Sequence, residues 1–126
     1  MSVLPGDERG SVTVVTAGML VVLFVLVLGS ADVAKTLAAV GRAQTAADAA
    51  ALAAAQEQVA PTGPGPQAVA GQYAASNGGT LVSCRCPPDG TEAVVDVEVQ
   101  VGHMLFLAGL DRVTATARAV VDLGGG

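Results

Sequence analysis

The 126-residue chain is poor in aromatic and basic side chains. It has no tryptophan, one tyrosine and two phenylalanines, so it lacks the platforms on which bases, sugars and flat cofactors stack. Six lysines and arginines, scattered singly, stand against eleven aspartates and glutamates. This balance argues against nucleic acid, because neutralising phosphates requires clustered basic side chains. We expect no nucleic-acid partner.

The chain also has little material for a catalytic or metal site. Its single histidine, His103, has no placed nucleophile, and its glycines form no phosphate-binding loop. Cys84, Cys86 and His103 do not have the spacing or the fourth ligand of a known zinc site. Asp96 and Glu98 alternate along a predicted strand, as solubilising charges do. We expect no enzymatic activity, no cofactor, no bound metal and no small-molecule substrate.

Charge is absent between Arg9 and Asp32. As a helix, the 21 residues from Ser11 to Ala31 would rise about 31 Å, which matches the roughly 30 Å hydrocarbon layer of a bilayer. Twelve valines, leucines and phenylalanines between Val12 and Leu28 favour insertion by roughly 4 to 7 kcal/mol. We therefore expect residues 11–31 to form a transmembrane helix with the lipid bilayer as a partner.

Three interpretations of this apolar run are open. In the first, residues 1–31 are a secretory signal peptide cut after Ala31, which would release a small secreted domain. In the second, the run is the uncleaved anchor of a single-pass envelope scaffold protein with no filament role. In the third, residues 1–10 are a cytoplasmic leader like that of a type IV prepilin, cut after Gly10 so that Ser11 becomes the amino terminus.

Beyond Asp32 the sequence becomes rich in alanine but keeps a helical period. Residues 11–58 read as one helix about 70 Å long, whose extra-membrane part, residues 32–60, continues the stem. We expect an apolar stripe along this part to face the rest of the protein. Its members are Val33, Leu37, Val40, Ala47, Ala51 and Ala54.

Residues 61–123 predict a small α+β head, followed by a flexible tail, 124–126. The prolines and glycines of 61–66 end the long helix, and a short helix follows at 67–76. Three runs predict an antiparallel sheet, because apolar and polar residues alternate in two of them. These runs are 80–86, 93–101 and 113–122, with an apolar connector at 103–110. The expected fold is thus α+β, with the stem helix packed on a three-stranded antiparallel sheet, as in pilins.

Cys84 and Cys86 are the only cysteines. They lie two positions apart on a predicted strand, so both side chains point to the same face. A disulfide between them, two free thiols, and a link to another subunit all remain open for a head outside the cytoplasm.

Three segments carry a resemblance to the TadE-like minor pilins and pseudopilins, specifically the short helicase/secretion-neighbourhood group. They are Arg9–Thr13, which opens the stem, the alanine-rich Gln44–Ala55, and Asn77–Cys84, which precedes a valine-rich strand. The resemblance implies export, anchoring in the cell membrane with the amino terminus cytoplasmic and the head outside, and a part in assembling a Tad (Flp, type IVc) pilus or a related secretion apparatus.

The same resemblance implies contacts with other pilin and Tad assembly subunits through the stem. Flp-type prepilins usually carry glutamate at the fifth mature position, where this chain has Val15. Relatives often have a cysteine before the short helix that would pair with Cys84, and Cys86 stands as its replacement here.

Overall fold

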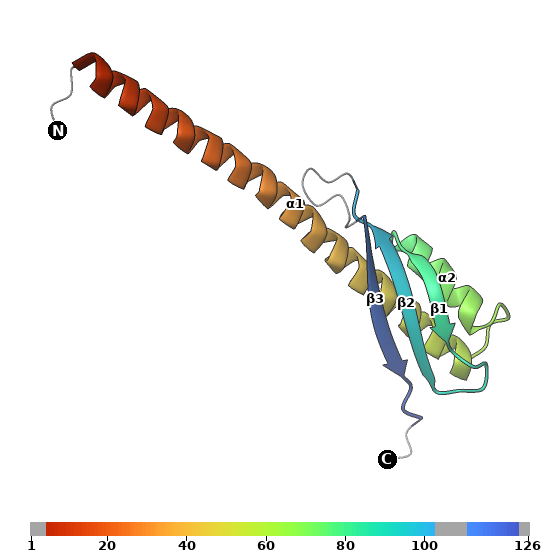
Figure 1. Ribbon diagram of the computed structural model, residues 1–126. Coiled ribbons are helices and arrows are strands. Elements are labelled where there is room, and N and C mark those ends of the chain that lie inside the picture. Colours follow the sequence, from red (N-terminus) through yellow and green to blue (C-terminus); the bar gives the residue numbers. More distant parts are fainter. Residues whose placement is uncertain (1–4, 103–110, 124–126) are drawn as a thin grey trace.

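The computed structural model describes residues 5–102 and 111–123, and one long helix dominates it (Figure 1). Helix α1, Pro5–Val59, has 55 residues, which corresponds to about 82 Å of rise. It begins inside the expected leader rather than at Ser11, with a proline in its first turn, where a fixed φ suits a helix start. The helix passes Asp32 without a break, as the sequence predicts.

The first part of α1 is apolar and uncovered. From Gly10 onward the helix contains an 18-residue window with a mean hydropathy of 2.7, of which 0% is buried. In the part of the chain that the structure describes, α1 is the one helix long and apolar enough to cross a membrane.

The proline- and glycine-rich segment after α1 turns the chain back. Gly63 and Gly65 adopt φ values of +129° and +95°, a conformation that costs glycine little. Helix α2, Pro66–Ser76, starts with proline in its first turn. It ends where the Gly79 N–H donates to the Ala74 carbonyl at 2.8 Å. The short helix predicted at 67–76 is confirmed.

Three antiparallel strands form one sheet in the order β1-β2-β3. They are β1, Thr80–Arg85, β2, Glu92–Gln100, and β3, Arg112–Val120. The register of β2 and β3 is regular along the whole of both strands, whereas the register of β1 and β2 shifts between Leu81 and Ser83. The α+β class and the three-stranded antiparallel sheet are confirmed, while the 103–110 connector and the 124–126 tail lie outside the described residues.

The sheet buries one face against α1. Along β2 the predicted alternation holds, with Ala93, Val95, Val97 and Val99 buried and the intervening residues partly exposed. Helix α1 packs on β2 and β3, and α2 packs on α1 and β1. The long helix is therefore not the only cover of the sheet, because α2 shares that role beside β1 (Figure 1).

The buried face of α1 consists almost entirely of alanine, and the expected stripe is partly wrong. Val33, Leu37 and Val40 are 52%, 65% and 45% exposed. A helix that approaches a valine-rich sheet closely has room for methyl groups only, so the larger side chains lie on other faces of α1. The buried alanines of α1 are Ala39, Ala43, Ala46, Ala47, Ala50, Ala51, Ala53, Ala54 and Ala55.

Candidate functional site: the stem helix

The most extensive exposed apolar surface belongs to the first half of α1. Its valines, leucines, methionine and phenylalanine between residues 12 and 27 are each more than half exposed, from Val25 at 51% to Val14 at 71%. Contiguous apolar surface of this kind marks contact with a membrane or with other proteins. These side chains surround the helix on all sides, which is typical of a segment immersed in apolar surroundings.

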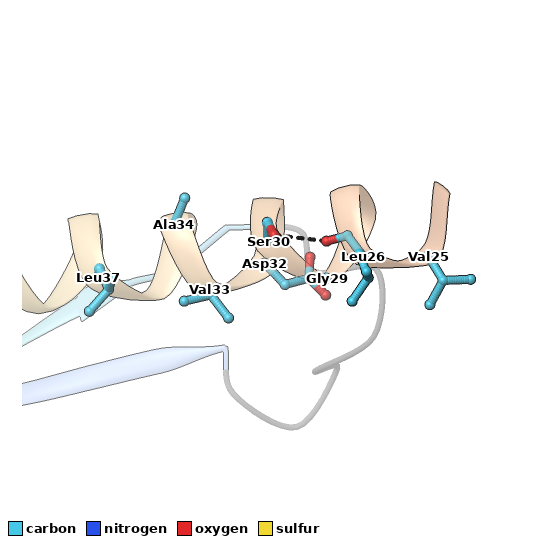
Figure 2. A pocket seen from close by; sticks show the side chains of 8 residues that line it. All are labelled: Val25, Leu26, Gly29, Ser30, Asp32, Val33, Ala34 and Leu37. Atoms are coloured by element: carbon cyan, nitrogen blue, oxygen red, sulfur yellow. Dashed lines mark hydrogen bonds between the residues drawn. The ribbon is translucent and has the colours of Figure 1, made fainter. Parts of the chain in front are cut away.

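A shallow hollow of about 720 Å³ lies along α1 at the end of this run (Figure 2). Gly29 lies on its floor, and a Cβ there would meet nothing within 4 Å. The Ser30 hydroxyl donates to the Leu26 carbonyl at 2.8 Å, so this polar group is satisfied within its own helix. Leu26, Val33 and Leu37 also line the hollow, so its lining is mainly apolar.

Asp32 marks the change from apolar to mixed sequence. The side chain is 1% exposed, and the Thr36 hydroxyl donates to the Asp32 carbonyl at 3.0 Å. The aspartate thus follows the apolar run directly, at the position where the sequence places the end of the hydrocarbon layer.

The possible cleavage site lies within the helix. Gly10 and Ser11 are exposed and helical, and a Cβ added at Gly10 would meet nothing within 4 Å. Packing within the described residues therefore does not require glycine at position 10. Cleavage after Gly10 stays a prediction.

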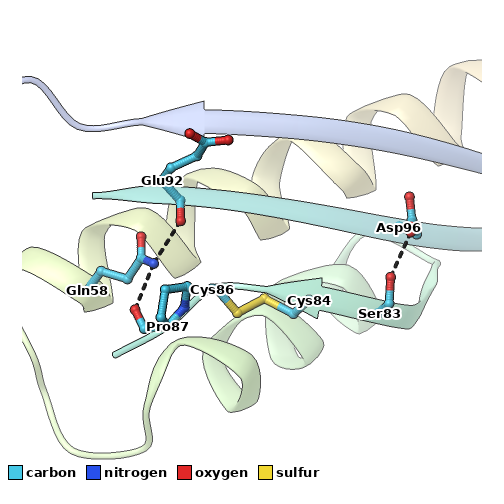
Figure 3. The surroundings of a disulfide bond; sticks show 7 residues. All are labelled: Gln58, Ser83, Cys84, Cys86, Pro87, Glu92 and Asp96. Atoms are coloured by element: carbon cyan, nitrogen blue, oxygen red, sulfur yellow. Dashed lines mark hydrogen bonds between the residues drawn. A yellow bond between two sulfur atoms is a disulfide. The ribbon is translucent and has the colours of Figure 1, made fainter. Parts of the chain in front are cut away.

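The structure joins Cys84 and Cys86 in a disulfide (Figure 3). Their Cα atoms are 5.4 Å apart, within the usual range for a bridged pair. Cys84 lies on β1, while Cys86 follows the last residue of that strand and is 8% exposed. The bond therefore fixes the point at which the chain leaves the sheet.

Sequence analysis missed two side chains at the end of α1, Glu57 and Gln58. The Gln58 amide nitrogen donates to the carbonyls of Pro87 and Glu92, both at 2.8 Å (Figure 3). Gln58 is 5% exposed, so it holds the β1–β2 turn against the helix from inside the protein. The sequence did contain a signal for these contacts. Glu57 and Gln58 end an alanine-rich helix beside a loop whose backbone N–H groups need hydrogen-bond acceptors.

Glu57 organises the loop that follows α1. Its carboxylate accepts hydrogen bonds from the Thr62 hydroxyl at 2.7 Å and the Thr62 N–H at 2.9 Å. It also accepts from the N–H groups of Gly63 and Gly65, at 3.1 and 3.3 Å. These bonds, led by the one from the Thr62 hydroxyl, hold the pKa of Glu57 below its ordinary value.

The outer face of the sheet carries a hydrogen-bonded carboxylate rather than isolated solubilising charges. Asp96 accepts from the hydroxyls of Thr116 and Ser83, the latter at 2.7 Å. These bonds, with that of Thr116 first, lower the pKa of Asp96. Glu98 lies 3.5 Å from Arg112. Asp96 thus ties all three strands together.

The candidate metal ligands are only partly placed. Cys84 and Cys86 are bonded to each other, and His103 lies outside the described residues. In residues 5–102 and 111–123, no group of three histidine, cysteine, aspartate or glutamate side chains could hold a metal ion.

Residues 10–57 match the family model described as putative Flp pilus-assembly TadE/G-like. The stem of this chain is therefore similar to those of TadE/G-like pilus-assembly proteins. This match confirms the predicted resemblance to TadE-like proteins, and the family supports a role in Tad pilus assembly. The matched segment starts at the glycine of the possible cleavage site and ends at the glutamate that organises the loop. No curated protein and no solved structure matches the chain significantly.

Proposed function

We propose that this chain is a membrane-anchored minor pilin or pseudopilin of a Tad (type IVc) pilus or a related secretion apparatus. The TadE/G-like stem carries the proposal, because its unburied apolar window can lie either in lipid or against the apolar stems of other subunits. Its partners are the bilayer and other Tad assembly subunits. The protein acts by assembly and is not an enzyme.

In the proposed arrangement the amino terminus is cytoplasmic and the head lies outside. The basic residues near the ends of the apolar run do not decide the orientation, since Arg9 on one side is matched by Lys35 and Arg42 on the other. The disulfide supports an external head, because such bonds persist outside the reducing cytoplasm.

Sequencing the amino terminus of the mature protein tests the proposal. Ser11 as the first residue supports prepilin processing, whereas Asp32 would identify a secreted domain and Met1 or Ser2 an uncleaved anchor. A Gly10→Leu variant should keep its leader, while Gly18→Leu, at another exposed and unpacked helical glycine, serves as the matched control. Extraction of the full chain from vesicles by carbonate would contradict the anchoring.

One observation favours a subunit that stays in the membrane. Val15 stands where Flp-type prepilins carry glutamate, so the stem offers no carboxylate to a neighbour's amino terminus at that position. A single-pass scaffold of the assembly machinery, rather than a filament subunit, fits this residue. Recovery of the protein with the membrane platform, and its absence from sheared filaments, would support that alternative.

A further inference from the structure

The two edges of the sheet differ in how well they are protected against another strand. β1 has six residues, and its register shifts between Leu81 and Ser83. The Cys84–Cys86 bond joins the end of β1 to the residue after it, and two prolines follow. β3 has nine residues and no irregularity. Bulges, prolines and short length protect an edge strand, and so do charged side chains. β1 has the first three, whereas the protection of β3 is limited to the charged side chains of Arg112 and Arg118.

The register shows which backbone groups of β3 lie at the outer edge. The Val101 N–H donates to the Asp111 carbonyl and the Val121 N–H to the Thr91 carbonyl. Because hydrogen-bonded pairs alternate in an antiparallel ladder, the odd-numbered residues of β3 bond to β2 and the even-numbered ones point away from it. Within the described residues, β2 is the only strand paired with β3. The outward residues are Arg112, Thr114, Thr116, Arg118 and Val120.

The polar side chains that could obstruct this edge are drawn back over β2. Arg118 meets the Glu92 carboxylate with two contacts, of 2.9 and 3.0 Å. Arg112 lies 3.5 Å from the Glu98 carboxylate. The Thr116 hydroxyl donates to Asp96. Each of these contacts crosses to the neighbouring strand, so among residues 5–102 and 111–123 these side chains do not cover the outer edge of β3.

We propose that the outer edge of β3 receives an extended segment of another assembly subunit as a fourth strand. The segment has apolar side chains toward α1, because Val113, Ala115 and Ala119 are partly buried and carry the core to the edge of the sheet. On the solvent side it has acidic side chains. Arg112 and Arg118 are the charged side chains of β3, and their side chains are 61% and 65% exposed. Their partners Glu98 and Glu92 lie on β2, away from the incoming strand, and Arg112 also lies 3.9 Å from Asp111, directly before β3.

A second copy of this chain fits the edge less well. A two-fold pairing of β3 with β3 is antiparallel, so it would turn one stem end over end relative to the other. Two stems anchored in one membrane, as proposed above, cannot adopt that arrangement. Pairing of β3 with the other sheet edge of a second copy would use β1. That strand is a poor partner, because its register is irregular and its end is tied by the Cys84–Cys86 disulfide.

Amide hydrogen exchange on the full chain in lipid nanodiscs gives the first test. In the free protein, the amides of Thr114, Thr116 and Arg118 should exchange rapidly, while those of Ala115 and Ala117, bonded to β2, should be protected. Protection of the even-numbered amides in the free protein would overturn the proposal, because the edge would already be covered.

Titration with a nine-residue peptide of alternating valine and glutamate gives the second test. We expect this peptide to protect the even-numbered amides of β3. It should bind about tenfold more tightly than a second nine-residue peptide, in which lysine replaces glutamate. The chain has a net charge of −5, so unspecific electrostatic attraction predicts the opposite preference. Equal or tighter binding of the lysine peptide, or protection at β1, would refute the inference.

Matched variants isolate the backbone contribution. Thr114→Pro removes one outward N–H without touching the ladder to β2, and should weaken the glutamate peptide about tenfold relative to Thr114→Val. A peptide with alternate N-methylated residues should not bind, and this arm does not depend on the folding of any variant. Binding that survives both changes would exclude strand addition.

Vesicle flotation of the same samples reports membrane anchoring of the stem separately. Failure of the strand-addition proposal is therefore distinguishable from failure of the proposed membrane-anchored function.

Discussion

Gly79, directly before β1, packs closely against α1 and β2, and Gly79→Ala tests how closely these elements pack. A Cβ at this position would lie 2.5 Å from Val97 Cγ1, 3.1 Å from Ala46 Cβ and 3.4 Å from the Glu98 carbonyl oxygen. Ala46 and Val97 are both 0% exposed, so neither can move aside freely. Overpacking of this kind costs about 1 to 3 kcal/mol of unfolding free energy.

Hydrogen exchange of the β2 amides, measured on the full chain in detergent micelles, reports this loss. We expect exchange about 5 to 150 times faster in Gly79→Ala than in the wild type, because each 1.4 kcal/mol corresponds to a factor of ten. The assay follows the head alone, so the persistent helicity of the stem does not obscure the result.

Gly71→Ala is the matched control. Gly71 lies inside α2, and its added Cβ would make an ordinary contact of 3.8 Å with Leu81 Cδ2. Replacing a helical glycine by alanine should stabilise the head by about 0.5 to 1 kcal/mol. The reasoning is refuted if Gly79→Ala leaves exchange unchanged, or if Gly71→Ala destabilises the head as strongly.

Three further predictions concern polar groups and the disulfide. The pKa of Glu57 is lowered, so its contribution to stability is present above its unfolded pKa and is lost as the pH falls through the lower folded value. Glu57→Gln should therefore expose the amides of Thr62, Gly63 and Gly65 to faster exchange at neutral pH and flatten the acid dependence. Asp96→Ala should loosen the outer face of the sheet and speed exchange in β1 and β3, whereas unchanged rates would show that its two hydroxyl partners contribute nothing. Reduction of the Cys84–Cys86 bond should add about 2 Da without forming a dimer. Because the closed loop has only three residues, serine at both positions should cost no more than about 1.6 kcal/mol.

The strands and the long helix could be predicted because their patterns have one dominant period. The alternation of Ala93, Val95, Val97 and Val99 predicts which face of β2 is buried, and the structure agrees. The buried face of α1 could not be predicted in the same way. Alanine is common on every side of that helix, so hydrophobicity pointed to Val33 and Leu37, which are exposed.

The polar contacts were harder to predict, since each joins residues far apart in the sequence. Gln58 reaches the carbonyls of Pro87 and Glu92, and Asp96 reaches hydroxyls on both neighbouring strands. Residue type indicates that such groups need partners, but only the register and the turn geometry select them. The stem, by contrast, could be predicted from the sequence, because the length and hydropathy of an apolar run are local properties.

The alanine surface of α1 leaves the axial position of the head weakly determined by packing. Successive turns present the same methyl groups, so sliding the sheet by one turn, about 5.4 Å, exchanges one set of alanine contacts for an equivalent set. Gln58 removes this degeneracy, because its two hydrogen bonds to the β1–β2 turn can form at one height only. Together with the close approach of Gly79 to Ala46, this amide side chain sets the position of the head along the stem.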